Sequence, residues 1–132
     1  MLSIVMIACD ETLARGYRRL GLFGTRVTMQ GGFFQKVFQS DGIQLFIPEL
    51  ADQDFIHTAY VDELVKGNFH AETRRRFVGI SNKMIRDQAI EALVLGGTEL
   101  PLLLRGTTDL RIPAIDTGRL HVLRALDLAL QE

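Results

Sequence analysis

Short apolar runs alternate with longer amphipathic stretches along most of this chain, and this alternation constrains the fold more than any other feature. The runs that we expect to be strands cover residues 19–25, 43–48, 92–97 and 112–116. A run that is apolar throughout is typical of a parallel strand with both faces covered. Strands separated by helices indicate an α/β fold. We therefore predict a single domain over residues 1–132, with three layers around a mostly parallel four-stranded sheet.

Helical periodicity marks the segments between these runs. In "MQGGFFQKVFQS", Phe34 and Phe38 stand four residues apart, as on one buried helix face. Similar stripes predict helices over 52–67, over 71–88 and from Thr117 onward, with Thr117 as the N-cap of the last helix. That last helix is apolar on almost every side, which predicts burial against several neighbours. The first fifteen residues fit either a strand or a helix, and the pattern does not separate the two.

Composition excludes several classes of function. The 132 residues carry a formal net charge of −1 at pH 7, which does not provide the basic surface that nucleic-acid binding needs. No apolar run is long enough to span a bilayer, and the opening residues lack the features of a secretory signal. The single cysteine, Cys9, excludes an internal disulfide, and the three histidines include no short-spaced pair for a metal. We therefore expect a cytoplasmic protein without nucleic-acid, membrane or metal partners.

Polar residues follow the predicted strands at the edge of the sheet where ligands bind. In parallel α/β sheets, ligands bind beyond the carboxyl ends of the strands. The residues at those ends are Gly24–Thr25, Pro48–Glu49, Gly97–Thr98–Glu99 and Asp116–Thr117. We expect the candidate site to be built from these four groups.

Five segments of the chain resemble one known family. They are GLFGTRVTM (21–29), IPE (47–49), GNF (67–69), LGGTELPLLL (95–104) and IPAIDTGRLH (112–121). Their order and spacing resemble the aspartate/glutamate racemases over residues 15–130, whereas residues 1–14 match poorly. The resemblance implies a family fold of two similar α/β domains that face each other across a cleft. This chain looks like the second domain with the closing C-terminal segment, so we expect a truncated member that lacks the first domain.

The resemblance implies racemisation of an acidic amino acid without a cofactor. That reaction removes a proton from one face of Cα and returns one to the other, so it needs two acid/base groups. Family members usually supply two thiols, one from each domain, and the second lies in a Leu-Gly-Cys-Thr-Glu motif. The corresponding residues here read LGGTE (95–99), so Gly97 occupies the cysteine position. Cys9 is the remaining thiol, but it matches no family motif, and a lone cysteine is more often a small buried hydrophobe.

The resemblance also implies residues that hold the ligand's carboxylate. Thr25 and Thr28 match threonines of a turn that faces the cleft. Thr98 follows the missing thiol, beside backbone N–H groups that could form an anion nest. The alternative is that these threonines only stabilise turns. Glu99 occupies the family's Glu position, where it would support the loop.

Two histidines complete the candidate site residues. His70 follows "GNF", where some aspartate-specific relatives carry a lysine that faces the side-chain carboxylate. A histidine there could supply partial positive charge, or it could simply start a helix at the surface. His121 matches a family histidine near the domain junction, with a buried structural histidine as the alternative. His57 matches no family residue.

These residues leave different classes of function open. One is an isomerase of the racemase family that is inactive alone, because Gly97 and the missing first domain remove both acid/base groups. Another is a non-catalytic module that binds a small carboxylate or a protein partner. A third is a truncated fragment whose active form needs a partner half. Apolar surface left uncovered by the missing domain predicts a homodimer formed through the last helix or the N-terminal segment.

Overall fold

A four-stranded parallel sheet forms the centre of the computed structural model, which describes residues 3–105 and 107–131. The strand order is β2–β1–β3–β4, and each neighbouring pair is parallel. The strands are β1 (Arg19–Phe23), β2 (Gln44–Phe46), β3 (Ala92–Leu95) and β4 (Ala114–Asp116). The predicted α/β fold and its four strands are confirmed, although each strand is shorter than its apolar run. The remaining residues follow the carboxyl ends of β1 and β3, flank β2 on both sides and precede β4.

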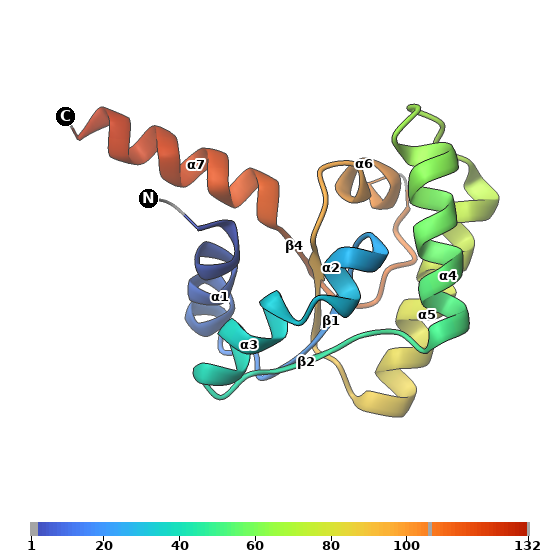
Figure 1. Ribbon diagram of the computed structural model, residues 1–132, viewed down its shortest axis with the longest axis horizontal. Helices are drawn as coiled ribbons and strands as arrows, with labels where there is room; N and C mark the ends of the chain where they lie inside the picture. The colour runs from blue at the N-terminus through green and yellow to red at the C-terminus, as the bar shows by residue number, and fades with distance from the viewer. Residues whose placement is uncertain (1–2, 106, 132) are drawn as a thin grey trace.

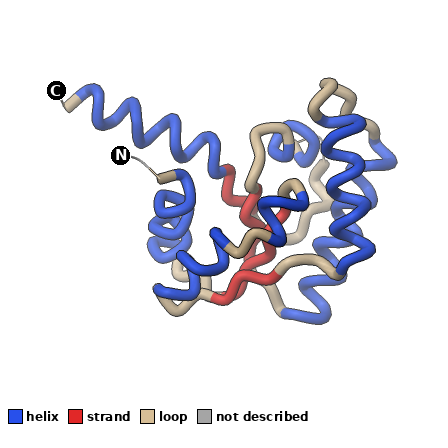
Figure 2. Tube along the Cα trace, viewed as in Figure 1, coloured by secondary structure: helices blue, strands red, loops and turns tan. Residues whose placement is uncertain are grey.

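Helices cover both faces of the sheet, which gives the predicted three layers (Figure 1, Figure 2). On one side lie α1 (Ile4–Arg15) and α3 (Phe33–Ser40), and on the other lie α4 (Leu50–Ala59), the π-helical turn η1 (Tyr60–Leu64), α5 (Ala71–Gln88) and α6 (Leu100–Leu104). Strand side chains alternate between these layers. Leu22 and Val94 pack with Phe38 of α3, whereas Leu93 and Leu95 pack with Phe77 of α5. Alternation of this kind is the period of a β-strand.

The N-terminal segment, which fitted either a strand or a helix, forms α1. Ser3 caps the helix, because its side chain accepts a hydrogen bond from the N–H of Met6 at 3.3 Å. Gly16 ends the helix in the left-handed conformation with φ 79°. The apolar residues of α1 face the sheet beside α3, and Cys9 lies among them with 1% of its surface exposed.

The segment between β1 and β2 corrects one prediction, because it forms two helices instead of one. The helix α2 (Arg26–Gln30) ends before a pair of glycines, and α3 begins after Gly32. Gly32 has φ 78°, which lies outside the helical region and favours glycine. The short helix α6 was not predicted either, because five residues show too little periodicity to separate a helix from a buried loop.

Thr117 is not the N-cap of the last helix, α7 (Thr117–Leu130). Asp116 caps it, because its Oδ1 accepts a hydrogen bond from the N–H of Arg119 at 2.9 Å. Thr117 is buried, and its hydroxyl donates to the carbonyl of Leu95 at 2.8 Å. This hydrogen bond of Thr117 connects the start of α7 to the end of β3, which Gly97 follows closely in the sequence.

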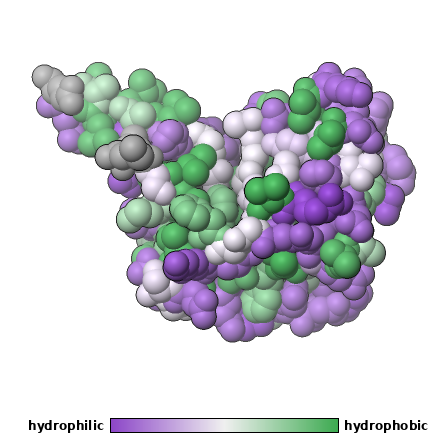
Figure 3. Space-filling model, in the orientation of Figure 1, coloured by the Kyte–Doolittle hydropathy of each residue, from purple (hydrophilic) through white to green (hydrophobic). Residues whose placement is uncertain are grey.

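The helix α7 extends away from the rest of the molecule beside α1 (Figure 1). Among the residues that the structure describes, the expected burial of α7 against several neighbours is not found. Val122, Leu126 and Leu130 are 56%, 55% and 86% exposed. Apolar side chains are visible along this arm in Figure 3. In the described part of the chain, none of the helices has the length and apolar character that crossing a membrane requires.

Candidate functional site

A cavity of about 230 Å³ lies beyond the carboxyl ends of β3 and β4. The strand ends and helix starts that line it contribute Thr28, Gly96, Gly97, Thr98, Thr117 and Gly118. Ile4 of α1 and Phe34 of α3 supply apolar walls. The structure thus brings together residues that follow β1, β3 and β4, as the position of ligand sites in parallel sheets predicts. It does not bring in Pro48–Glu49: the Glu49 carboxylate pairs with Lys83 of α5 in a separate pocket.

Thr25 and Thr28 lie together on the turn that joins β1 to α2. Their hydroxyl oxygens are 3.3 Å apart, and Thr28 borders the cavity. Thr25 stands at the N-cap position of α2, but its side chain makes no capping hydrogen bond there. His57 of α4 takes part of that role instead, because its Nδ1 accepts the N–H of Arg26 at 3.0 Å. No local pattern predicts this contact, since the two residues lie far apart in the chain.

The loop after β3 presents backbone N–H groups at the cavity. Gly96 uses its N–H in the sheet, donating to the carbonyl of Phe23 at 2.8 Å. Gly97 and Thr98 donate no backbone hydrogen bond to any residue in 3–105 or 107–131. Gly118 lies in the first turn of α7, where helical N–H groups have no acceptor within the helix. Such groups bind anions, because their dipoles point toward the negative charge.

Glu99 is held by two hydroxyl groups. Tyr60 donates to its Oε1 at 2.5 Å, and Thr98 donates to the same oxygen at 2.9 Å. The hydrogen bond from Tyr60 lowers the pKa of Glu99, with a smaller contribution from Thr98. Burial raises the pKa of Tyr60 to about 12, and the neighbouring Glu99 adds to the effect. Glu99 is therefore an ionised acceptor, and Tyr60 a neutral donor, at neutral pH.

Gly97 is crowded on the side where a side chain would begin. A Cβ atom built at Gly97 would lie 2.8 Å from Cζ and 2.9 Å from Cε2 of Tyr60, with the hydroxyl oxygen nearer still. Real Cβ atoms essentially never approach other heavy atoms so closely. The ring of Tyr60 therefore occupies the space of a side chain at position 97. Tyr60 lies within the helix predicted over 52–67, but no local pattern indicates that it reaches Gly97.

Cys9 lies in the middle of α1 and does not border the cavity. Its Sγ donates to Asp41 at 3.2 Å, and Asp41 follows α3 just before β2 begins. Burial, strengthened by Asp41, raises the pKa of Cys9 to about 12. The thiol is thus neutral at physiological pH, and its hydrogen-bond partner Asp41 does not border the cavity either.

The predicted histidines lie outside the cavity. His70 is exposed at the N-cap position of α5, which agrees with the alternative of a helix start at the surface. His121 is partly buried on α7 and does not border the cavity. Within residues 3–105 and 107–131, no three His, Cys, Asp or Glu side chains are grouped so that they could hold a metal ion.

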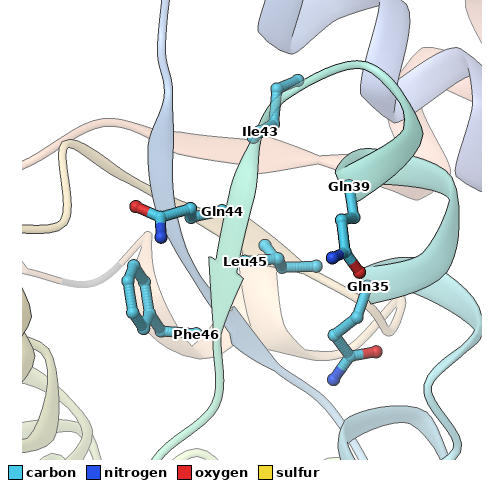
Figure 4. A pocket seen from close by; sticks show the side chains of 6 residues that line it. All are labelled: Gln35, Gln39, Ile43, Gln44, Leu45 and Phe46. Carbon is cyan, nitrogen blue, oxygen red and sulfur yellow. The ribbon is translucent and has the colours of Figure 1, made fainter.

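A second hollow of about 220 Å³ lies between α3 and the edge strand β2 (Figure 4). Gln35 and Gln39 border it from α3, while Gln44, Leu45 and Phe46 come from the strand. None of the residues that the sequence singled out for ligand binding contributes to it. We therefore take the cavity beyond β3 and β4 as the candidate site.

Comparison with known proteins identifies the family of this chain. A family model described as Asp/Glu/Hydantoin racemase matches residues 1–125. This chain belongs to the Asp/Glu/hydantoin racemase family. The match includes residues 1–14, which the sequence motifs left poorly matched. The predicted family is therefore confirmed, and the matched region includes α1.

Similar solved structures include an aspartate racemase homologue from Pyrococcus horikoshii OT3, with 29% identity and a TM-score of 0.89. A candidate Asp/Glu racemase from Yersinia pestis is 28% identical, with a TM-score of 0.87. Each comparison covers 98% of this racemase-family chain but 56% of the other protein. An uncharacterized protein in the pnlA 3′ region of Pectobacterium carotovorum subsp. carotovorum is 26% identical over 107 residues, or 79% of this chain and 67% of that protein. The chain therefore spans a little over half the length of the solved relatives.

Proposed function

We propose that this racemase-family chain binds a small carboxylate, such as an acidic amino acid, and does not racemise it by itself. One observation carries the proposal: the cavity beyond β3 and β4 combines unpaired backbone N–H groups with a glycine at position 97. The N–H groups supply what a carboxylate needs. Gly97 supplies no atom that could accept or return a proton.

Binding would rest on neutral donors. Gly97, Thr98 and Thr28 all line the cavity, so the backbone N–H groups of the first two and the hydroxyl of Thr28 are the donors that we assign to the ligand. Backbone donors of this kind bind a carboxylate through converging dipoles and need no lysine or arginine. The apolar walls from Ile4 and Phe34 would strengthen these hydrogen bonds by excluding water. This chemistry suits a small anion with a short aliphatic chain.

Catalysis would require a proton-transferring group that this site does not offer. General acid/base catalysis by one positioned side chain contributes about 10²- to 10⁴-fold in rate. Gly97 cannot provide that group, and Cys9 does not border the cavity and has a pKa raised to about 12. A racemase ancestor would thus have left a pseudoenzyme that retains binding, unless another chain completes the site.

Titration with L- and D-aspartate and L- and D-glutamate tests the proposal, with the midpoint of thermal unfolding as the readout. A ligand at a hundredfold excess over its Kd stabilises the folded state by about 2.7 kcal/mol. We expect stabilisation by at least one of these ligands and a weaker effect in Thr28→Val, which removes a hydroxyl that borders the cavity. Thr58→Val is the matched control, because Thr58 is exposed on α4. Equal ligand effects in the two variants, or none in the wild type, would contradict the proposal.

We further propose that the chain forms a homodimer through α7. Leu120, Arg124 and Asp127 of α7 border a hollow together with Ile7 and Glu11 of α1. Helical periodicity then places Val122, Leu126 and Ala129 on the opposite face. That face is apolar and exposed, as the 56% and 55% exposure of Val122 and Leu126 illustrates.

A second copy offers the same apolar face, and two identical faces can pair about a twofold axis, the commonest symmetry of soluble oligomers. Light scattering across a concentration series tests this. We expect a dimer that Leu126→Glu converts to a monomer, because dimerisation would bury the new charge. Val65→Glu is the control, since Val65 is 60% exposed just after η1. A wild-type monomer at every concentration would contradict the homodimer.

A further inference from the structure

We propose that Tyr60 determines what position 97 can carry: its ring fills the space where a side chain at that position would begin. Tyr60 and Gly97 are then a matched pair, and the site is closed to an acid/base side chain as long as Tyr60 is present. The inference concerns the same site as the proposed function. It depends only on packing, so it can fail or hold independently of carboxylate binding.

The steric conflict involves the tip of the ring. A Cβ atom at position 97 would meet Cζ and Cε2 of Tyr60 at 2.8 and 2.9 Å, and the hydroxyl oxygen at a shorter distance. A flexible side chain could turn away, but a tyrosine ring moves only as a rigid unit about two torsions. Even alanine at position 97 therefore requires Tyr60 to be displaced.

Three observations indicate that Tyr60 is fixed in place. Its residue exposure is 7%, and it belongs to the hydrophobic cluster that contains Phe77 and Leu100. Its hydroxyl donates to Glu99 at 2.5 Å. Its backbone carbonyl accepts the N–H of Val65 at 3.0 Å across the π-helical turn η1. Side chain, hydroxyl and backbone are thus all held, so a residue at position 97 cannot displace the ring without breaking native contacts.

Tyr60 does not replace the family thiol chemically. Its proton is donated to Glu99, and burial raises its pKa to about 12. A phenol with that pKa remains protonated at neutral pH, so it cannot remove a proton from Cα. Glycine at position 97 is therefore more than the loss of one sulfur atom: a single Gly97→Cys substitution would not restore the family arrangement.

A double-mutant cycle tests the pair through Gly97→Ala in three backgrounds, read as the midpoint of thermal unfolding. In the wild type we expect a fall of about 5 °C or more from overpacking. In Tyr60→Leu the ring tip is gone, so the same substitution should cost less than half as much. In Tyr60→Phe the hydroxyl is gone but Cζ and Cε2 remain, so most of the cost should persist. Gly79→Ala is the control, because nothing lies within 4 Å of a Cβ at Gly79.

Each outcome of the double-mutant cycle either supports or overturns the pairing of Tyr60 with Gly97. Failure of Gly97→Ala to fold in the wild type, with recovery in Tyr60→Leu, supports the pairing. An equal loss in all three backgrounds, or failure to fold in both the wild type and Tyr60→Leu, would overturn it. So would full tolerance of Gly97→Ala in the wild type.

Thiol reactivity gives a readout that a general loss of stability would not move. The wild-type protein gives the background reaction rate, because its cysteine, Cys9, is 1% exposed. We expect Gly97→Cys combined with Tyr60→Leu to react with a disulfide reagent at the rate of an accessible thiol and with the pH dependence of thiolate formation. A Gly97→Cys protein that folds as stably as the wild type and reacts equally fast with Tyr60 present would show that the ring does not block the position.

Discussion

Thiol chemistry in this chain would be sought at two places, position 97 and position 9. Each has the feature that the other lacks. Position 97 borders a cavity with backbone donors, yet it is a glycine pressed against Tyr60. Position 9 carries the thiol, yet it is buried on α1 and does not border the cavity. A catalytic thiol needs a cavity and a sulfur atom in the same place. This chain keeps the two apart, which supports the proposal of binding without catalysis.

The largest effect that would sharpen this comparison is expected from Gly97→Cys. Because two ring atoms and the hydroxyl oxygen of Tyr60 occupy the space needed, we expect the free energy of unfolding to fall by about 3 kcal/mol, the upper end of the range for overpacking. Urea denaturation measures the change. A fall of only a few tenths of a kcal/mol would mean that position 97 has room for a side chain, and the contrast with position 9 would disappear.

A smaller effect with a distinct pH dependence is expected from Tyr60→Phe. Loss of a hydrogen bond to an ionised carboxylate costs about 1.5 kcal/mol at neutral pH. Glu99 has a lowered pKa when folded, so this stabilisation is present above its unfolded pKa and is lost as the pH falls through the folded value. Urea midpoints near pH 7 and near pH 3 give the measurement. A penalty that is the same at both pH values would show that the Glu99 charge is not involved.

Replacing the thiol itself should matter less. Cys9→Ala removes a small buried group and its contact with Asp41, so we expect a loss of about 1 kcal/mol in stability. Carboxylate binding, read by thermal shift, should be unchanged because Cys9 does not border the cavity. Weakened binding in Cys9→Ala would connect the two regions and break the comparison.

The smallest effect is expected at a glycine that lies in open space. Gly79 is exposed in the middle of α5, and a Cβ there would meet nothing within 4 Å. Gly79→Ala should raise the free energy of unfolding by about 0.5–1 kcal/mol, because alanine favours the helix. Thermal unfolding of Gly79→Ala and of Gly97→Ala, measured under the same conditions, compares the two glycines directly. A loss of stability at Gly79 would mean that glycine substitution in this chain reports something other than local space.

The fold was predictable wherever burial leaves a repeating pattern in the sequence. β3 is apolar throughout because helices cover both of its faces, and α5 shows one buried stripe because only one face packs on the sheet. Sequence patterns did not predict the local structure where it depends on one or two residues. The break between α2 and α3 depends on Gly32 at φ 78°, and the cap of α7 depends on which of two adjacent polar residues reaches Arg119.

The site was predictable only in part. Position in the chain identified Thr28, Gly97 and Thr98, because strand ends of a parallel sheet meet at one edge. The contacts of Tyr60 with Gly97 and Glu99 join segments almost 40 residues apart, so no local pattern reports them. Ile4 and Phe34 line the cavity because α1 and α3 pack beside it. Periodicity alone does not predict how these two helices are placed, so the sequence alone did not identify Ile4 and Phe34.

Proton exchange at Cα tests most directly the claim that this site binds without catalysing. L-Aspartate and L-glutamate would be incubated with the protein in deuterated buffer under saturating conditions, and deuterium at Cα followed by NMR together with optical rotation. We predict no incorporation above the protein-free blank and no change in rotation. Steady deuterium uptake that scales with protein concentration and is abolished by Tyr60→Phe would contradict the account, because it would make Tyr60 a proton-transferring group.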